Sequence, residues 1–203
     1  MDITFGFVGD GFALVVCDTY ASAHGLLSLR QNYDKILPLD SHKMLGLSGE
    51  FGDFTNFSEL IQANMQLYKF RNDYSLSTKA VAHFMRGELA TALRKGPYMV
   101  NLVLAGYDEA TGPSLYYLDY LACLHKMNCA GHGYGFTFTC SIFDKYWKPG
   151  LKLEEAMDIV DKCIAEIRSR LVVAPQSYIV KIVDKDGIRT VAEKYSAEID
   201  NTS

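Results

Sequence analysis

The sequence predicts an α+β protein with two antiparallel β-sheets stacked face to face, each covered on its outer side by a pair of helices. The predicted elements follow the order strands, two helices, strands, two helices, strands. A doubly wound sheet would alternate single strands with single helices, so the paired helices favour a four-layer αββα arrangement. Glycine-containing turns at residues 9–11 and 184–187 join apolar runs near both ends of the chain, which is typical of antiparallel hairpins.

The first half of the chain supplies strands and then the first helical pair. The strands expected here are residues 3–7, 12–16, 26–29, 35–37 and 43–47, after which residues 48–53 interrupt the pattern. Apolar residues then recur every three or four positions across 54–71, which predicts a helix with one apolar face. Ser77 is the expected N-cap of a second helix, which Gly96-Pro97 ends.

The second half of the chain repeats this order. It is expected to form strands at 101–106 and 115–121, helices at 137–146 and 153–167, and a last hairpin from 177–183 and 188–192. No linker, internal repeat or low-complexity stretch divides the sequence. We therefore expect a single domain over residues 1–195 and a loose polar tail over residues 196–203.

The composition indicates a globular protein rather than a disordered, fibrous or membrane-spanning one. The 203 residues are 49% hydrophobic and 22% charged, and 20 basic against 24 acidic residues give a formal net charge of −4. This mildly acidic balance lacks the electrostatic footprint of a nucleic-acid-binding protein. The longest apolar runs, such as residues 12–17, are far shorter than the roughly 20 residues that cross a bilayer. We expect neither nucleic acid nor a membrane as a partner.

Cysteine usage and the first residues predict an intracellular protein. The five cysteines are odd in number and include no C-x-x-C pair, which favours reduced thiols. Residues 1–4 have neither the basic nor the apolar region of a secretory signal, and no transit peptide is expected. The 13 tyrosines and 11 phenylalanines against one tryptophan predict large flat surfaces to cover, in the core or against partners.

A glycine-rich turn is the first of several weak hints at chemistry. Gly131-His132-Gly133-Tyr134-Gly135 precedes a predicted helix, where a phosphate could bind. It is not G-x-G-x-x-G, however, and no βαβ unit surrounds it, so a tight turn that allows close backbone packing is favoured.

Soft metal ligands gather near the same turn. Cys123, His125, Cys129 and His132 lie within ten positions, but their spacing matches no zinc pattern, and two buried thiols with two polar histidines are favoured. Residues 184–187 lack the glycine and glutamate positions of a calcium loop. There is no G-x-S-x-G elbow, and buried, inert cysteines are favoured over a catalytic thiol. We expect no metal and no cofactor.

The start of the first strand is the remaining candidate site. A chain that begins in a strand can use its first residue as a nucleophile, with its own α-amine as the base. That chemistry requires Thr, Ser or Cys, whereas Met1 and Asp2 stand here.

The whole chain resembles a proteasome beta subunit, of the N-terminal nucleophile hydrolase class, from residue 1 to about residue 195. The segments that carry the resemblance are residues 6–18 (GFVGDGFALVVCD), Lys35, 49–53 (GEFGD), 101–108 (NLVLAGYD), 112–122 (GPSLYYLDYLA) and 132–135 (HGYG). The tyrosine-rich strand and the HGYG turn are most similar to the subunit at the fourth position of the eukaryotic beta ring. The resemblance implies a four-layer αββα sandwich, the N-terminal nucleophile hydrolase fold, in agreement with the element order.

The resemblance identifies which catalytic positions are kept. Active relatives begin their mature chain with Thr after a cleaved propeptide that ends in Gly, whereas Met1-Asp2 occupies that place here and no propeptide is expected. Their Asp after the first hairpin matches Asp18, and their Lys matches Lys35. Without a nucleophile to assist, Asp18 and Lys35 are expected to form an ion pair, partly buried, that orders the strand ends.

The other catalytic positions of active relatives are replaced. Their Ser in a Gly-Ser-Gly turn falls on His132, their second Asp on Leu171, and the Ser a few residues later on Ala174. Nucleophile, one acid and both serines are therefore missing. Because hydrolysis depends on these groups acting as a unit, the resemblance implies a site with no catalytic residue.

The implied role is that of a non-catalytic structural subunit of the 20S proteasome core particle, in the cytoplasm and nucleus. Such a subunit contributes to beta-ring assembly and to the wall of the chamber in which ATP- and ubiquitin-dependent degradation takes place. The implied partners are the beta subunits at the third and fifth ring positions, the alpha ring and the opposite beta ring, and much of the aromatic surface is expected to face them.

Two other hypotheses remain open from the sequence. The first is an active N-terminal threonine hydrolase, formed by trimming to Thr4. Against it, Ile3 rather than Gly precedes Thr4, and Thr4 is expected to lie inside the first strand. The second is a stand-alone metal- or nucleotide-binding module.

Overall fold

The computed structural model describes residues 2–23, 27–30 and 32–195, and it is built from two five-stranded antiparallel sheets. The first sheet has the strand order β10 (Cys129–His132), β1 (Thr4–Val8), β2 (Phe12–Asp18), β11 (Ser177–Asp184) and β12 (Gly187–Tyr195). The second has the order β5 (Ile36–Asp40), β6 (Lys43–Gly49), β7 (Val100–Asp108), β8 (Gly112–Leu118) and β9 (Leu124–Met127). A small hairpin of β3 (Ala21–Ala23) and β4 (Leu27–Arg30) stands apart from both.

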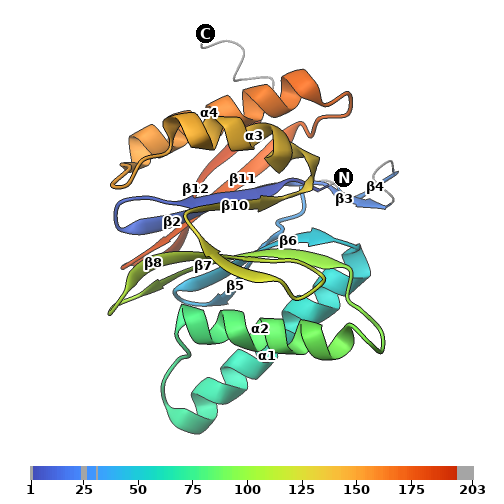
Figure 1. Cartoon of the computed structure of the whole chain (residues 1–203), viewed down its shortest axis with the longest axis vertical. Coiled ribbons are helices and arrows are strands. Elements are labelled where there is room, and N and C mark those ends of the chain that lie inside the picture. The colour runs from blue at the N-terminus through green and yellow to red at the C-terminus, as the bar shows by residue number, and fades with distance from the viewer. Residues whose placement is uncertain (1, 24–26, 31, 196–203) are drawn as a thin grey trace.

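Four helices cover the outer faces of the two sheets (Figure 1). The pair α3 (Gly133–Tyr146) and α4 (Leu153–Arg170) lies on the first sheet, and the pair α1 (Phe51–Asn72) and α2 (Thr78–Ala92) lies on the second. The expected αββα sandwich is therefore confirmed. None of the described helices has the length and apolar character that a bilayer crossing requires.

Three buried apolar clusters hold the four layers together, and the side chains of β2 contribute to two of them. Every residue of this strand is buried. Its sequence is therefore an unbroken apolar run up to Cys17, without the alternation of apolar and polar residues seen in half-exposed strands. Its side chains still alternate: Leu14 and Val16 pack toward α3 and α4, whereas Val15 and Cys17 pack against the second sheet. The third cluster lies between the second sheet and the α1–α2 pair.

The phenylalanines mostly serve this core. Phe5 and Phe7 of β1 are fully buried, and their rings lie 5.9 and 5.5 Å from that of Phe143 in α3. Phe70, by contrast, is 82% exposed. The expectation that much of the aromatic surface faces partners is thus wrong for most phenylalanines. It stays a prediction for the exposed tyrosines, which among the described residues are Tyr74, Tyr120, Tyr134, Tyr146 and Tyr195.

The expected elements are present, with shifted ends. Ser77 caps α2 as predicted, because its side chain accepts the N–H of Ala80 at 3.2 Å. Helices α1 and α3 begin at Phe51 and Gly133, three and four residues earlier than expected. The predicted strand 115–121 is wrong at both ends, since β8 spans Gly112–Leu118.

Three strands were not expected from the sequence: β3, β9 and β10. Each has three or four residues, and β9 is mostly exposed, so neither length nor alternation marks it. The predicted strand 26–29 corresponds to β4, except that residue 26 lies outside the described residues, as does the predicted tail 196–203.

Candidate functional site

Three charged side chains meet at one end of the sandwich. The ammonium Nζ of Lys35 lies 2.8 Å from both carboxylate oxygens of Asp18 and 2.8 Å from Oδ1 of Asp2. The side chains of Lys35 and Asp18 are fully buried, and that of Asp2 is 14% exposed. The ion pair expected between Lys35 and Asp18 is present, but it is completely buried and has Asp2 as a third member. We call these three residues the ion triad.

Backbone amides at the strand ends hold both carboxylates of the triad. Asp18, the last residue of β2, accepts the N–H of Ile3 at 2.7 Å. Asp2 accepts the N–H of Gly49, the last residue of β6, at 3.0 Å. Lys35 directly precedes β5, and its carbonyl accepts the N–H of Leu47 at 3.0 Å. The triad therefore ties the first sheet to the second.

The charge state of the triad follows from burial and from the short contacts. Burial alone would lower the pKa of Lys35, but the carboxylates of Asp18 and Asp2 outweigh it and raise that pKa above its usual value. Burial raises the pKa of Asp18, although Lys35 and the N–H of Ile3 pull it down. Because Lys35 makes three charge-assisted hydrogen bonds at 2.8 Å, we assign it as an ammonium.

The glycine-rich turn wraps around the residues that follow Asp2. Gly133 has a φ of +83°, and a β-carbon there would lie 2.1 Å from the carbonyl oxygen of Asp2. A β-carbon on Gly131 would lie 2.7 Å from the carbonyl oxygen of Thr4, and one on Gly135 would lie 2.7 Å from the side chain of Ile3. These glycines are thus needed for close packing against the start of β1, as the sequence favours over phosphate binding.

His132 is buried at the end of β10, beside Thr4 of β1 in the sheet register. Its Nε2–H donates to the carbonyl of Leu102 in β7 at 3.0 Å, and its ring stacks on Tyr117 of β8 at 4.3 Å. Burial lowers the pKa of His132 from its usual 6.5 to about 4, so the ring is neutral at pH 7. His132 therefore joins the two sheets as an uncharged hydrogen-bond donor.

Thr4 lies inside β1, as expected, and is fully buried. Its hydroxyl donates to the carbonyl of Leu47 at 3.2 Å and lies 3.4 Å from the sulfur of Cys17. A hydroxyl in this position is committed to the contact between the sheets and is closed to a substrate carbonyl.

The last two predicted positions lie at the end of α4 and in the loop that follows. Leu171 is the C-cap residue of α4, where its N–H donates to Ile167, and its side chain packs against the apolar cluster under α3 and α4. Ala174 is partly buried in the loop before β11. Neither side chain carries a group that can accept or donate a proton. Of the six positions that the sequence singled out, the structure therefore brings together Asp2, Asp18 and Lys35, and the other three do not join their charge cluster.

The ion triad cannot activate a nucleophile in the arrangement shown. A lysine acts as a base only through a free amine lone pair, whereas the nitrogen of Lys35 is directed at three carboxylate oxygens. The group that Lys35 meets at the start of the chain is the carboxylate of Asp2 rather than a hydroxyl. The geometry thus supports an electrostatic clamp between strand ends.

The soft-ligand cluster near the glycine-rich turn is not assembled. The expectation of two buried thiols is wrong for Cys123, which is exposed, with its sulfur 3.2 Å from Nε2 of the exposed His125. Cys129 is only partly buried and packs beside α3 and α4, and His132 lies between the sheets. Within the described ranges, no three His, Cys, Asp or Glu side chains lie close enough together to hold a metal ion. Residues 184–187 form the β11–β12 turn, as predicted.

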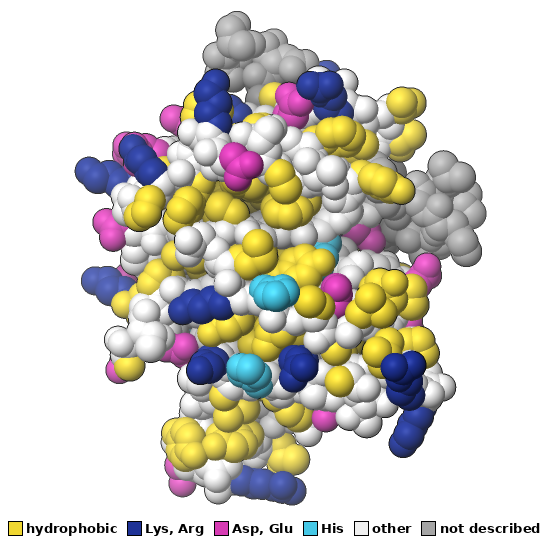
Figure 2. Space-filling model, viewed as in Figure 1, with side chains coloured by type: hydrophobic (Ala, Val, Ile, Leu, Met, Phe, Trp, Pro, Cys, Tyr) yellow, Lys and Arg dark blue, Asp and Glu magenta, His cyan; other side chains and the backbone are white. Residues whose placement is uncertain are grey.

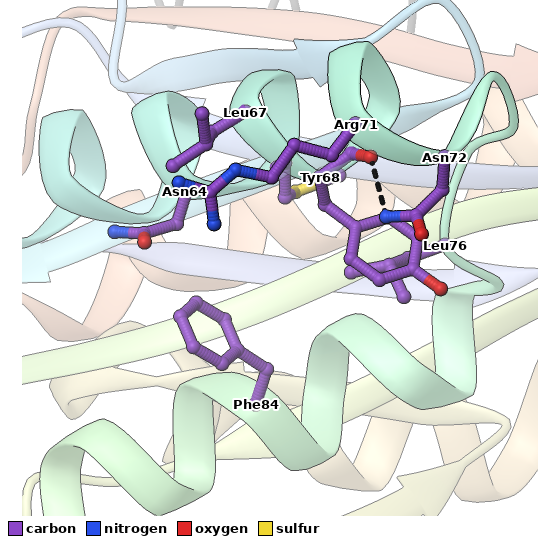
Figure 3. A pocket seen from close by; sticks show the side chains of 8 residues that line it. Asn64, Leu67, Tyr68, Arg71, Asn72, Leu76 and Phe84 are labelled. Atoms are coloured by element: carbon purple, nitrogen blue, oxygen red, sulfur yellow. Dashed lines mark hydrogen bonds between the residues drawn. The ribbon is translucent and has the colours of Figure 1, made fainter.

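A groove between α1 and α2 is separate from these residues (Figure 3). It has a volume of about 240 Å³; Phe84 of α2 and Leu76 line it, and Arg71 and Asn64 reach over it from α1. Asn72 beside it donates to the carbonyl of Tyr68 at 2.9 Å. The described lining residues include no carboxylate and no histidine, so the groove offers no acid–base pair.

Sequence reasoning missed two contacts of this site. It placed Asp2 where a nucleophile would stand but did not predict that its carboxylate binds Lys35. It also missed the N–H of Gly49 as the second partner of Asp2. The sequence did contain one signal. Asp2 lies two residues before Thr4, which is buried in β1, and a buried lysine such as Lys35 needs a nearby negative charge.

Comparisons with known proteins give one consistent result for the chain. A family model described as proteasome subunit matches residues 2–183. Proteasome subunit beta type-2-A of Arabidopsis thaliana is 54% identical over 198 residues, which cover 98% of this chain and 97% of that protein. Proteasome subunit beta type-2 of Oryza sativa subsp. japonica is 54% identical over 194 residues, covering 96% of this chain and 91% of that protein. Proteasome subunit beta type-4 of Saccharomyces cerevisiae is 40% identical over 194 residues, covering 94% and 97%.

Proposed function

Because this chain belongs to the proteasome subunit family, we propose that it is a non-catalytic beta subunit of the 20S proteasome core particle, of the beta type-2 kind. Its work is structural: it contributes to assembly of the beta ring and to the wall of the chamber in which proteins are degraded. The proposal keeps the fourth ring position for this subunit, with neighbours at the third and fifth positions.

One observation carries the non-catalytic part of this proposal. The carboxylate of Asp2 occupies the place beside Lys35 where active relatives have their nucleophile, and together with Asp18 it neutralises the lysine. A hydroxyl nucleophile and a free amine are both needed for acyl transfer in this class of site. The threonine nearest in sequence, Thr4, is buried and bound to Leu47.

The experiment that tests catalysis uses the assembled particle. We expect a threonine-directed electrophile to label other subunits and to leave this chain unlabelled. We also expect its intact mass to include Asp2 and Ile3. A covalent adduct on Thr4, in a chain trimmed to that residue, would establish the threonine hydrolase in place of the structural subunit.

Contact with other subunits is the second part of the proposal, and exposed apolar residues support it. Leu67, Phe70 and Tyr74 are 43%, 82% and 59% exposed near the end of α1. Figure 2 shows apolar side chains at the surface over both helical layers, mixed with charged ones. Such surface is costly to leave in water and suits burial against the alpha ring, the opposite beta ring or a ring neighbour.

The location proposed for the chain is the cytoplasm and nucleus, with the particle. Imaging of a tagged chain that still enters the particle tests this location. A signal confined to any other compartment would contradict it.

A further inference from the structure

A thiol and an imidazole meet on the surface where β8 gives way to β9, on elements that carry no member of the ion triad. The sulfur of Cys123 lies 3.2 Å from Nε2 of His125, and both side chains are exposed. Cys123 directly precedes β9, of which His125 is the second residue, and their contact places the two side chains on the same face. At this distance the imidazole nitrogen can accept the thiol proton.

The backbone around the thiol is fixed by one carboxylate. Oδ1 of Asp119 accepts the N–H groups of Leu121 at 3.0 Å and Cys123 at 2.8 Å, and the N–H of Asp119 donates to the carbonyl of Cys123 at 3.3 Å. Ala122 takes the left-handed conformation within this closed turn, with φ of 63°. Cys123 is therefore held toward His125 by a structured turn.

The four other cysteines provide an internal comparison. Cys17 and Cys163 are buried, and Cys129 and Cys140 are partly buried. Burial raises the pKa of Cys17 and Cys129 to about 12, and it raises the pKa of Cys163 and Cys140 as well. Because the thiolate is the reactive form of cysteine, these four are disfavoured as nucleophiles.

We propose that Cys123 is a thiol–disulfide exchange site, at which a small disulfide such as glutathione disulfide forms a mixed disulfide with the chain. The thiol proton passes to Nε2 of His125, and the Cys123 thiolate attacks one sulfur of the small disulfide. The new bond joins Cys123 to that sulfur, the original S–S bond breaks, and the departing thiolate takes up the proton from His125. One disulfide replaces another, so no further oxidant is consumed.

Two further titratable groups near the thiol are Tyr117 and Asp119. Tyr117 of β8 lies opposite His125 in the strand register. Burial, followed by the charges of Asp119 and Cys123, raises the pKa of Tyr117, which keeps its phenol neutral. Asp119 is occupied by the two backbone amides. His125 is thus the group positioned to take the proton.

The test exposes the full-length chain to glutathione disulfide at pH 7 and follows each cysteine by peptide mass spectrometry. We expect Cys123 to be modified at least about tenfold faster than any other cysteine. The fast adduct is expected to vanish in Cys123→Ser and to persist in the control Cys140→Ser. Modification of Cys140 at an equal or greater rate would overturn the proposal.

A second variant tests His125 separately from folding. His125→Gln is expected to slow exchange at Cys123 by about fivefold or more, with an unchanged Tm. The increase of the exchange rate with pH is expected to occur at higher pH in this variant. The matched control is His83→Gln on the exposed face of α2, which should leave the rate unchanged. If His125→Gln keeps both the rate and the pH profile of the unaltered chain, the assigned role of the imidazole is wrong.

Discussion

Lys35 is the residue on which the electrostatics of the site depend. Its buried ammonium balances two carboxylates, one of which is fully buried and the other nearly so. Removing the lysine leaves two carboxylates without a counter-charge, whereas removing the Asp2 carboxylate leaves the Lys35–Asp18 pair intact. Because an unpaired buried charge costs far more than a broken contact in water, these two changes should differ in their effects.

Lys35→Met is therefore expected to lower the free energy of unfolding by about 3–5 kcal/mol. Asp2→Asn is expected to cost about 1–3 kcal/mol, because one charged hydrogen bond is lost and the amide can still accept the N–H of Gly49. Urea unfolding of the full-length chain measures both values. The matched control is Lys148→Met, which breaks the exposed contact with Glu155 and should leave the midpoint unchanged. Equal tolerance of Lys35→Met and Lys148→Met would contradict the ion triad as a structural clamp.

His132 predicts a loss of stability in mild acid. Burial lowers its pKa from 6.5 to about 4, so between these values the unfolded chain binds a proton that the folded chain does not. Stability is therefore complete above about pH 6.5 and falls as the pH approaches 4, by up to roughly 3 kcal/mol. Asp18, whose pKa is raised, contributes with the opposite sign at the acid end of this range. The contribution of His132 is isolated by comparing the chain with His132→Gln.

In His132→Gln the amide still donates to Leu102 but does not titrate. The pH dependence between 6.5 and 4, measured by urea unfolding at several pH values, should accordingly be shallower in the variant. Parallel curves for the two chains would mean that His132 is not held neutral by burial.

The connection from β10 to α3 shows how one short element positions another. Gly133 begins α3 with a φ of +83°, and its α-carbon faces the carbonyl oxygen of Asp2. A side chain here would push the start of β1, and with it the Asp2 carboxylate, away from Lys35. The turn is thus part of the clamp although it carries no charge.

Gly133→Ala is expected to destabilise the full-length chain by roughly 2 kcal/mol or more, because the alanine would be strained at a left-handed φ and its β-carbon would lie only 2.1 Å from the carbonyl oxygen of Asp2. Gly87→Ala is the matched control, since nothing lies within 4 Å of a β-carbon at this position in α2. There the gain in helix propensity should stabilise the chain by up to about 1 kcal/mol. Thermal unfolding of both variants measures these changes in stability, which should have opposite signs. An unchanged Tm in Gly133→Ala would refute the close-packing role of the turn.

Elements with strong local signals were predictable from the sequence. The apolar positions of α1 and α4 recur at helical spacing, and the turn glycines mark the first and last hairpins. Strand β9 was missed because its exposed residues show no alternation, and β10 because its four residues include a glycine. Strand β10 is also defined by its pairing with β1, which is distant in sequence.

Members of the site could be predicted only where the sequence has the same residue type as the family at the matching position. Asp18 and Lys35 are recognised in this way, but their contact with Asp2 depends on how β1, β2 and β5 come together. The sequence shows that Cys123 and His125 are two positions apart, yet their 3.2 Å contact arises from a turn that Asp119 closes. The spacing of residues in the sequence determines on which face of a strand a side chain lies, whereas the packing of the elements determines which groups that side chain contacts.

At the scale of the whole molecule, α1 is unusual because it is apolar on more than its inner side. Phe54, Phe57 and Ile61 pack against the second sheet, while Leu67 and Phe70 lie exposed on the same helix. Large apolar side chains that are exposed together on a surface are typical of an interaction site. The outer side of α1 is therefore expected to be covered in the assembled particle.

Phe70→Asp tests this expectation without disturbing the fold. Because Phe70 is 82% exposed, the urea midpoint of the free chain should hardly change. Incorporation into a particle far larger than the 22.7 kDa chain, measured by co-purification, should fall by about tenfold or more, since a buried aromatic contact at an interface is worth about 2 kcal/mol. Phe70→Leu is the matched control, because it keeps an apolar side chain at the same position and should retain most of the incorporation. If Phe70→Asp enters the particle as readily as Phe70→Leu, the outer side of α1 faces water there, and its apolar residues need another explanation.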